Sequence, residues 1–355
     1  MKKLEILLGV MAVLWLSACE VVIDIESGES TERITINAFL SPDTTVTAYV
    51  TEASGLETFS NMALRSNYYT YDKVENRREV MYLDTTITPY ILAEADVRIK
   101  VNGQQEYKMT YNPQYLTYDS DYVPQYGDEV QITASSMSNA NKNGERVKLD
   151  KVKATATLPG QPKIEVLDKK VVYKEREYYN VGGVADVPAV DYWGEDSVMQ
   201  ITLRITDAVN ERNFYRLAVR SVGASHAYSK ENKMEYVCVD HFTSSDILFY
   251  DANLKKSYGT TPANFSNVFD DNMINGKKYV FVVESRKRRD SEITPYVIVE
   301  LQQLSPDMYY YMKDIELFRI SDFDLYVDPI QISSNVKGGW GVFGAMSYDR
   351  HIVEF

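Results

Sequence analysis

The chain has 355 residues, of which 45% are hydrophobic and 25% are charged, and its formal net charge is −13. This acidic balance argues against nucleic acid as a partner, because affinity for phosphates comes from Lys and Arg. With only two cysteines the chain is not a disulfide-rich scaffold, and its length is enough for two domains.

The amino terminus has the pattern of an export signal. Lys2 and Lys3 precede an apolar stretch at residues 6–16, which is too short to span a bilayer, since a helix needs about 20 residues for that. A charged start, a short apolar middle and an exit of small residues indicate a leader that is removed after export. Residues 1–18 are therefore the predicted signal peptide.

The exit from this leader, Leu16-Ser17-Ala18-Cys19, resembles the bacterial lipobox. The thiol of Cys19 is nucleophilic enough to take a diacylglyceryl group, and the new amino terminus can take a further chain such as palmitate. Two or more chains hold a protein firmly to a membrane. Cys19 is thus the predicted lipidation site, followed by an acidic tether at residues 19–32. The alternative is an ordinary secretory leader with an accidental cysteine.

Residues 33–158 are predicted to form an amino-terminal β-sandwich. Apolar and polar residues alternate there at a period of two, which is typical of half-buried strands. The apolar positions are Ile34, Ile36, Ala38, Leu40, Val46, Ala48, Val50, Ala95, Val97, Ile99, Val101, Val130, Ile132, Ala134, Val152, Ala154, Ala156 and Leu158. Turn signals such as Asn102-Gly103 separate the segments. A Tyr-rich stretch at residues 56–86 is expected to be an insertion.

The second half is predicted to be β-rich as well. Leu158-Pro159-Gly160-Gln161-Pro162 reads as a linker, and a carboxy-terminal β-rich domain is expected at residues 163–355. Strand-like alternation returns at residues 199–205, 214–222, 279–283 and 296–301. The predicted fold class is therefore mainly β, with two or more antiparallel β-sandwich-like domains.

One segment near the carboxy terminus breaks the period of two. Ser305-Pro306-Asp307 predicts a helix start, because Ser caps free backbone amides, Pro suits the first turn and Asp favours the positive end of the helix dipole. One short helix is expected to run to about residue 318. Its buried side should carry Met308, Met312 and Ile315, with Leu317 or Phe318.

Several motifs carry a resemblance to a known family. They are ADVRI at residues 95–99, NFYR at 213–216, NGKKY at 275–279, LSPDMYYY at 304–311, DPIQISSNV at 328–336 and GGWGVFGA at 338–345. The sequence resembles domain-of-unknown-function family 4249, a group of Bacteroidota lipoproteins. The resemblance implies a lipoprotein often encoded beside TonB-dependent outer-membrane transporters, and it implies no catalytic residues. The glycines of GGWGVFGA are expected to form a turn leading into a closing strand, with Trp340 important for folding.

Metal-binding and catalytic patterns are weak. Cys238 and Asp240 point to one face of a strand and His241 to the other, without the paired spacing of a zinc finger. Residues 270–276 hint at calcium but lack the terminal Glu of a helix-loop-helix site, so an irregular calcium loop stays open. The chain has no Gly-x-Ser-x-Gly, His-Glu-x-x-His or phosphate-loop motif. We therefore expect no metal, no cofactor and no enzymatic activity.

Tyrosine is the informative excess, with 28 Tyr against 12 Phe and 3 Trp. Its large ring and polar tip suit interfaces, although strands of secreted β-proteins also use it. The tyrosines that lie beside Asn and Asp in turn-like segments are the predicted binding residues: Tyr68, Tyr69, Tyr71, Tyr118 and Tyr122.

These patterns together predict a lipid-anchored, non-enzymatic accessory protein of the outer membrane that faces the cell exterior and binds a ligand or a TonB-dependent transporter. The anchor would raise its effective concentration near that partner. The alternatives are a surface hydrolase with a carboxylate site and a structural adhesin-like subunit. An enzyme should show a pocket with converging acids, whereas a partner subunit should show a broad Tyr-rich apolar patch.

Overall fold

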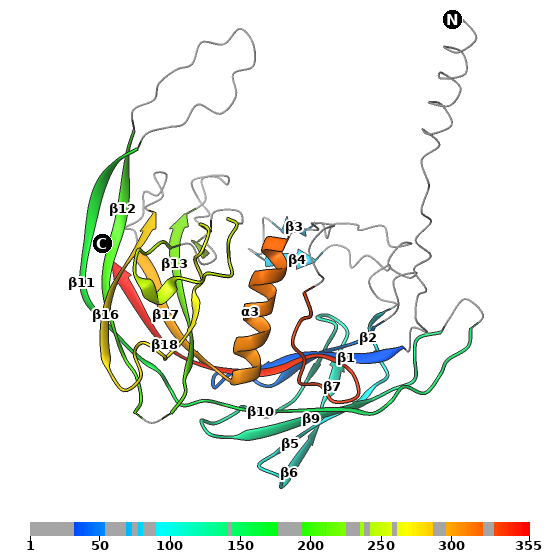
Figure 1. Ribbon diagram of the computed structural model, residues 1–355. Helices are drawn as coiled ribbons and strands as arrows, with labels where there is room; N and C mark the ends of the chain where they lie inside the picture. The colour runs from blue at the N-terminus through cyan, green and yellow to red at the C-terminus, as the bar shows by residue number, and fades with distance from the viewer. Residues whose placement is uncertain are drawn as a thin grey trace, which may run out of the picture. The chain divides into compact units, whose positions relative to one another are not determined.

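The computed structural model describes residues 32–53, 69–72, 77–80, 90–140, 144–176, 194–209, 211–224, 235–237, 242–257, 261–286, 296–321 and 330–355. They form several antiparallel sheets and, near the carboxy terminus, helix α3 (Pro306–Ser321), as Figure 1 shows. The predicted fold class, mainly β with one helix near the carboxy terminus, is confirmed for these residues. In this part of the chain no helix has both the length and the apolar character needed to cross a membrane. The signal peptide and Cys19 lie outside it.

The largest sheet has nine strands. Eight lie in the order β14 (Glu235–Val237), β13 (Phe214–Ala224), β17 (Tyr296–Leu304), β18 (Trp340–Glu354), β1 (Arg33–Leu40), β2 (Thr47–Ala53), β8 (Thr117–Asp119) and β7 (Thr110–Asn112), and β15 (Val268–Asp270) pairs with β13. Strand β18 is central to it, because residues 346–354 pair antiparallel with β17 and residues 340–345 pair parallel with β1. Figure 1 shows β18 in red, running from β1 to β17.

Three smaller sheets complete the described structure. One has four strands in the order β10 (Val152–Thr157), β9 (Glu129–Ser135), β5 (Asp96–Val101) and β6 (Gln105–Lys108). A second has three, in the order β11 (Lys163–Arg176), β12 (Gly194–Thr206) and β16 (Lys278–Arg286). The third is the antiparallel pair β3 (Tyr69–Asp72) and β4 (Arg77–Val80), which falls within the predicted insertion at residues 56–86.

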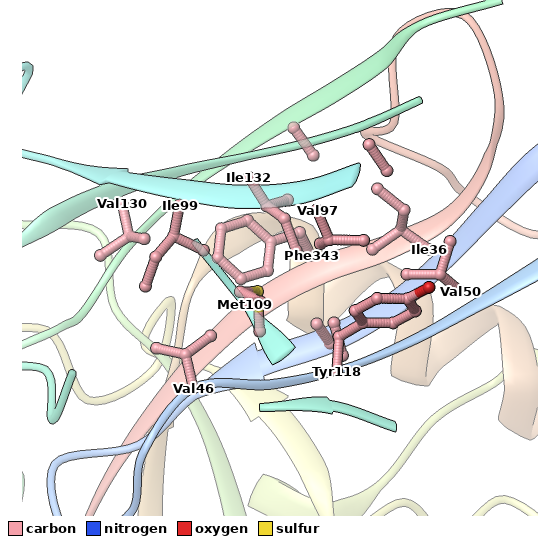
Figure 2. Close-up of a cluster of buried hydrophobic side chains, with 14 of the residues drawn as sticks. Ile36, Val46, Val50, Val97, Ile99, Met109, Tyr118, Val130, Ile132 and Phe343 are labelled. Carbon is pink, nitrogen blue, oxygen red and sulfur yellow. The ribbon is translucent and has the colours of Figure 1, made fainter. Parts of the chain in front are cut away.

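The first hydrophobic core contains every apolar position predicted between residues 33 and 158 except Ala95, which is partly buried and packs against it. Their side chains come from β1 and β2 of the large sheet and from the four-stranded sheet, and β18 adds Phe343 and Ala345. Figure 2 shows Phe343 among Ile99, Ile132 and Met109. The period-two pattern therefore identified this core directly, whereas the contribution of β18 comes from the far end of the chain.

The second hydrophobic core is formed by β12, β16, β13 and β17. Its members include the alternating residues Met199, Ile201, Leu203 and Ile205, and β18 contributes Val353. One strand thus supplies side chains to both cores. The boundary predicted at residues 158–163 stays a prediction, but residues Arg33–Ala53 and Arg65–Phe355 make one compact unit.

Two glycines explain how β18 reaches its neighbours. Gly341 has φ +97°, and a Cβ there would lie 2.0 Å from the carbonyl oxygen of Ile36 in β1. A Cβ at Gly344 would lie 2.8 Å from the side chain of Met308 in α3. Glycine therefore permits both the parallel pairing and the packing of the helix on this strand. Trp340 itself is 46% exposed, with Arg33 over its ring, so the glycines are the stronger candidates for a folding role.

The helix begins where the sequence predicts, but the side chain of Ser305 does not cap the helix amides as expected. The Ser305 carbonyl accepts the first helical bond, from the Tyr309 amide at 3.0 Å. The Ser305 hydroxyl accepts from the Ala345 amide at 3.0 Å, and the Ser305 amide donates to the Ala345 carbonyl at 2.8 Å. Ser305 therefore joins the helix start to β18. At the other end Phe318 is 46% exposed, so it is not part of the buried side.

Candidate functional site

A pocket of about 590 Å³ lies beside α3 and is lined by described residues. Met308, Met312 and Ile315 come from the helix, and residues between 242 and 256 and between 261 and 268 provide the facing wall. Ligand sites in proteins commonly measure about 300–1,000 Å³ and combine apolar walls with a few polar groups. The volume of this pocket falls within that range, and its lining combines apolar side chains with polar and charged ones.

The helix face that lines the pocket follows from residue spacing. Met308, Met312, Ile315 and Arg319 are separated by four, three and four positions, which places them on one face of a helix. The sequence predicts the first three as a buried side, but only Met308 is below a tenth exposed. The rest of this face borders the pocket and ends in the charged residue Arg319.

Aromatic residues stiffen the facing wall. The ring centroids of Phe242 and Phe265 are 5.3 Å apart in an edge-on contact, and Phe249 lies 5.8 Å from Phe265. Phe242 and Phe249 belong to the second hydrophobic core. This wall is therefore part of the packed structure and does not need a ligand to form.

The charges around the pocket are unequal. Its lining has three basic residues, Arg216, Lys256 and Arg319, and one acidic residue, Glu316. Arg216 lies on β13 and donates from Nη1 to Oε1 of Gln302 at 3.1 Å. Burial lowers the pKa of Arg216, and the neighbouring positive charge of Arg220 lowers it further. Basic residues therefore outnumber acidic ones in this lining, although the chain as a whole has a net charge of −13.

The carboxylate of Glu316 is held by its own neighbours. Its Oε2 lies 2.7 Å from the hydroxyl of Ser266 and 3.2 Å from Nζ of Lys313. Burial raises the pKa of Glu316, although Lys313 and Ser266 act in the opposite direction. Lys313 also forms a close ion pair with Asp251. Burial would raise the pKa of Asp251, but the bonds from Lys313 and the Asn253 amide outweigh it and hold that pKa below its usual range.

A second charged group lies on the same sheet face as Arg216. Glu300 of β17 is 2% exposed and accepts bonds from Gln302 at 2.6 Å and from Arg350 at 2.6 Å. Arg220 lies 3.5 Å from the same carboxylate. Burial would raise the pKa of Glu300, but the bonds from Gln302 and Arg350 outweigh it and lower that pKa. Glu300 thus lies between two arginines, Arg220 and Arg350, on the sheet face that also carries Arg216 of the pocket.

The two central motifs, NFYR and NGKKY, meet at a buried hydrogen-bonded cluster. Asp207 accepts from the Tyr215 hydroxyl at 2.6 Å and from the Gly276 amide at 2.8 Å. Asp271 accepts from the Asn213 amide at 2.8 Å. These carboxylates connect β13 to the turn before β16, which is a structural role. The sequence gives no signal for Asp207, because it lies outside both motifs.

The candidate calcium loop at residues 270–276 contains this Asp271. Its carboxylate is 1% exposed and serves the backbone amide of Asn213. Within the described residues no three His, Cys, Asp or Glu side chains are grouped to hold a metal ion. Cys238, Asp240 and His241 lie outside those residues.

Four of the five predicted binding tyrosines, all but Tyr68, lie within the described residues. Tyr118 is wrongly placed by the prediction, because it is 2% exposed and belongs to the first core, where Figure 2 shows its ring near Val50 and Ile36. Its hydroxyl donates to the Leu92 carbonyl at 2.5 Å and accepts from the Ala95 amide at 2.8 Å. Burial raises the pKa of Tyr118 to about 12. This tyrosine is a core residue and not a surface contact.

Tyr122 is half-buried and packs against the same core, with its ring 5.0 Å from that of Tyr107. Its hydroxyl bonds to Asp128, and burial and this bond raise the pKa of Tyr122. Tyr69 and Tyr71 lie in β3, so their part in binding stays a prediction. Tyr68 lies outside the described residues.

Comparison with known proteins adds one finding. No curated protein and no solved structure matches the chain. The model of a family described as "Domain of unknown function (DUF4249)" matches residues 20–352. This match spans nearly the whole chain, including both cores, the helix and the pocket. The chain therefore belongs to the DUF4249 family.

Proposed function

We propose that the protein is a lipid-anchored, non-enzymatic binding protein of the outer membrane that faces the cell exterior and serves a TonB-dependent transporter by capturing a ligand. The observation that carries ligand capture is the pocket beside α3, with its apolar walls and excess of basic residues. The anchor is supported by the leader and the lipobox that ends at Cys19. The transporter is supported by the resemblance of the motifs to lipoproteins encoded beside such transporters.

The same pocket gives less support to a surface hydrolase. Glycoside hydrolysis, for example, uses two carboxyl groups placed on either side of the bond that breaks. The lining here contains Glu316 as its one acid, and that carboxylate is hydrogen-bonded to Ser266 and Lys313.

Substitution of the two cysteines tests the anchor. Cys19→Ala should move the protein from the membrane to the soluble fraction, because it removes the only site for acyl chains. The matched control, Cys238→Ala, should leave the protein in the membrane. Mass spectrometry of the wild-type amino terminus should show the added acyl mass. Retention of Cys19→Ala in the membrane, or an unmodified Cys19, would contradict the proposal.

The transporter partnership has a separate test. Wild-type protein extracted in mild detergent should co-purify with a TonB-dependent transporter, and protease added to intact cells should cleave it. If no outer-membrane transporter co-purifies, the proposed partner is wrong. If the protein is fully protected from protease, the proposed outward orientation is wrong.

A further inference from the structure

We infer that the pocket beside α3 binds an organic anion with an apolar body, of which an aliphatic or aromatic carboxylate is the simplest form. This inference rests on the proposed function, since it names the class of ligand that the protein captures. It is argued from two halves of the same pocket, one apolar and one basic.

The apolar half fits the body of such a ligand. Met308, Met312 and Ile315 face the aromatic wall that contains Phe242 and Phe265. Methionine is flexible and polarizable, so it adapts to ligands of different shape, whereas the packed phenylalanines give a fixed surface. Burial of a ligand here is favourable by about 25 cal/mol for each Å² of apolar surface removed from water.

The basic half fits the charged end of the ligand. Arg216 on the sheet and Arg319 on the helix approach the pocket from two elements, and Lys256 approaches it from the facing segment. Arg319 is close enough to Arg216 for its positive charge to lower the pKa of Arg216, and an anion near both arginines would be stabilised. Arginine also binds carboxylate with two parallel hydrogen bonds, which fixes the orientation of the ligand.

The one acid in the lining does not cancel this preference. Glu316 is engaged by Lys313 and Ser266, and its buried environment raises its pKa. A cationic ligand would meet three basic residues and one acid that is already hydrogen-bonded. The pocket therefore favours an anion with an apolar body over a cation.

Three probes that share one apolar body test the inference. They are 2-naphthoate, the neutral 2-naphthamide and the cationic 2-naphthylmethylammonium, titrated calorimetrically against the mature protein purified in mild detergent, with titrations into the same detergent buffer subtracted. Decanoate provides a second anion with an aliphatic body. Both anions should bind with one site per chain, the amide more weakly, and the cation not at all. Binding of the anions should also weaken as salt is added.

Three variants locate the site. Arg319→Gln removes an exposed charge at the pocket. Binding of 2-naphthoate should weaken on the order of tenfold, since hydrogen bonds to charged groups are of that strength. Binding of 2-naphthamide should not change. Met312→Ala should weaken both probes. The matched control Lys100→Gln, at an exposed basic residue of β5, should change neither. Melting temperatures would show that all three variants are folded.

The inference is overturned if neither anion binds, if the neutral amide binds as tightly as 2-naphthoate, or if Lys100→Gln reduces binding as much as Arg319→Gln. None of these results depends on the anchor, so membrane release of Cys19→Ala tests the proposed function independently.

Discussion

Tyr118 shows how a residue chosen for its neighbours can be assigned to the wrong environment. The acids at positions 119 and 121 indicate a polar loop, but β8 is a strand of three residues, Thr117–Asp119. Three residues are too few for a period of two to be recognised in the sequence. The side chain is buried because its hydroxyl binds two backbone groups, the Leu92 carbonyl and the Ala95 amide. A buried tyrosine usually has such partners.

Tyr118→Phe should therefore lower the free energy of unfolding. Removal of the hydroxyl takes one bond from the Leu92 carbonyl and one from the Ala95 amide, which keep a 3.2 Å bond to each other, so the loss should be about 0.5–1.5 kcal/mol for each bond. Urea unfolding followed by circular dichroism would measure the change. The control is Tyr115→Phe, at a side chain that is 63% exposed, and it should have little effect. Unchanged stability of Tyr118→Phe together with loss of partner binding would restore the surface assignment.

At the scale of elements, strands were easier to predict than their partners. The alternation in residues 33–40 identifies β1 and its buried face, but nothing in it indicates that β1 pairs in parallel with residues 340–345. Close approach of the two strands depends on the missing side chain of Gly341, and a glycine in a sequence does not say which backbone it will meet. The family motif GGWGVFGA marks the segment without giving its neighbour.

The candidate site was missed for a related reason. The pocket draws on α3, β13 and residues within 242–256 and 261–268, which are far apart in the sequence. Most of its residues are apolar and look like ordinary core positions. One feature of the sequence could have indicated the pocket. The helical spacing of the apolar residues Met308, Met312 and Ile315 continues to the charged residue Arg319, and a helix face that ends in a charge borders solvent or a ligand.

Gly341→Ala tests the contact between these elements. The new Cβ would lie 2.0 Å from the Ile36 carbonyl oxygen at φ +97°, so β18 must move away from β1, and we expect a loss of about 3 kcal/mol or more of unfolding free energy. The control, Gly103→Ala, has φ +68° but no atom within 4 Å, so it carries the backbone strain alone, about 1–2 kcal/mol. Equal losses in the two variants would show that the contact with Ile36 is unimportant.

For the whole molecule, the shared strand predicts that the two cores unfold together. Phe343→Ala should destabilise the first core by about 3–5 kcal/mol, and Val353→Ala should destabilise the second by a smaller amount. Both residues lie on β18, so each variant should lower the temperature of one common transition. Differential scanning calorimetry would show a single peak in the wild type and in both variants. Two peaks, each shifted by only one variant, would instead support independent domains with a boundary at residues 158–163.

The pairing of β1 with β18 also has a consequence for the order of events during biosynthesis. Strand β1 ends at Leu40 and its parallel partner begins at Trp340, so β1 leaves the ribosome long before that partner is made. Until then β1 has one unpaired edge and the first core lacks Phe343, so the sheet cannot close. Completion of the first core therefore waits for residues 340–345, however early its other strands are made.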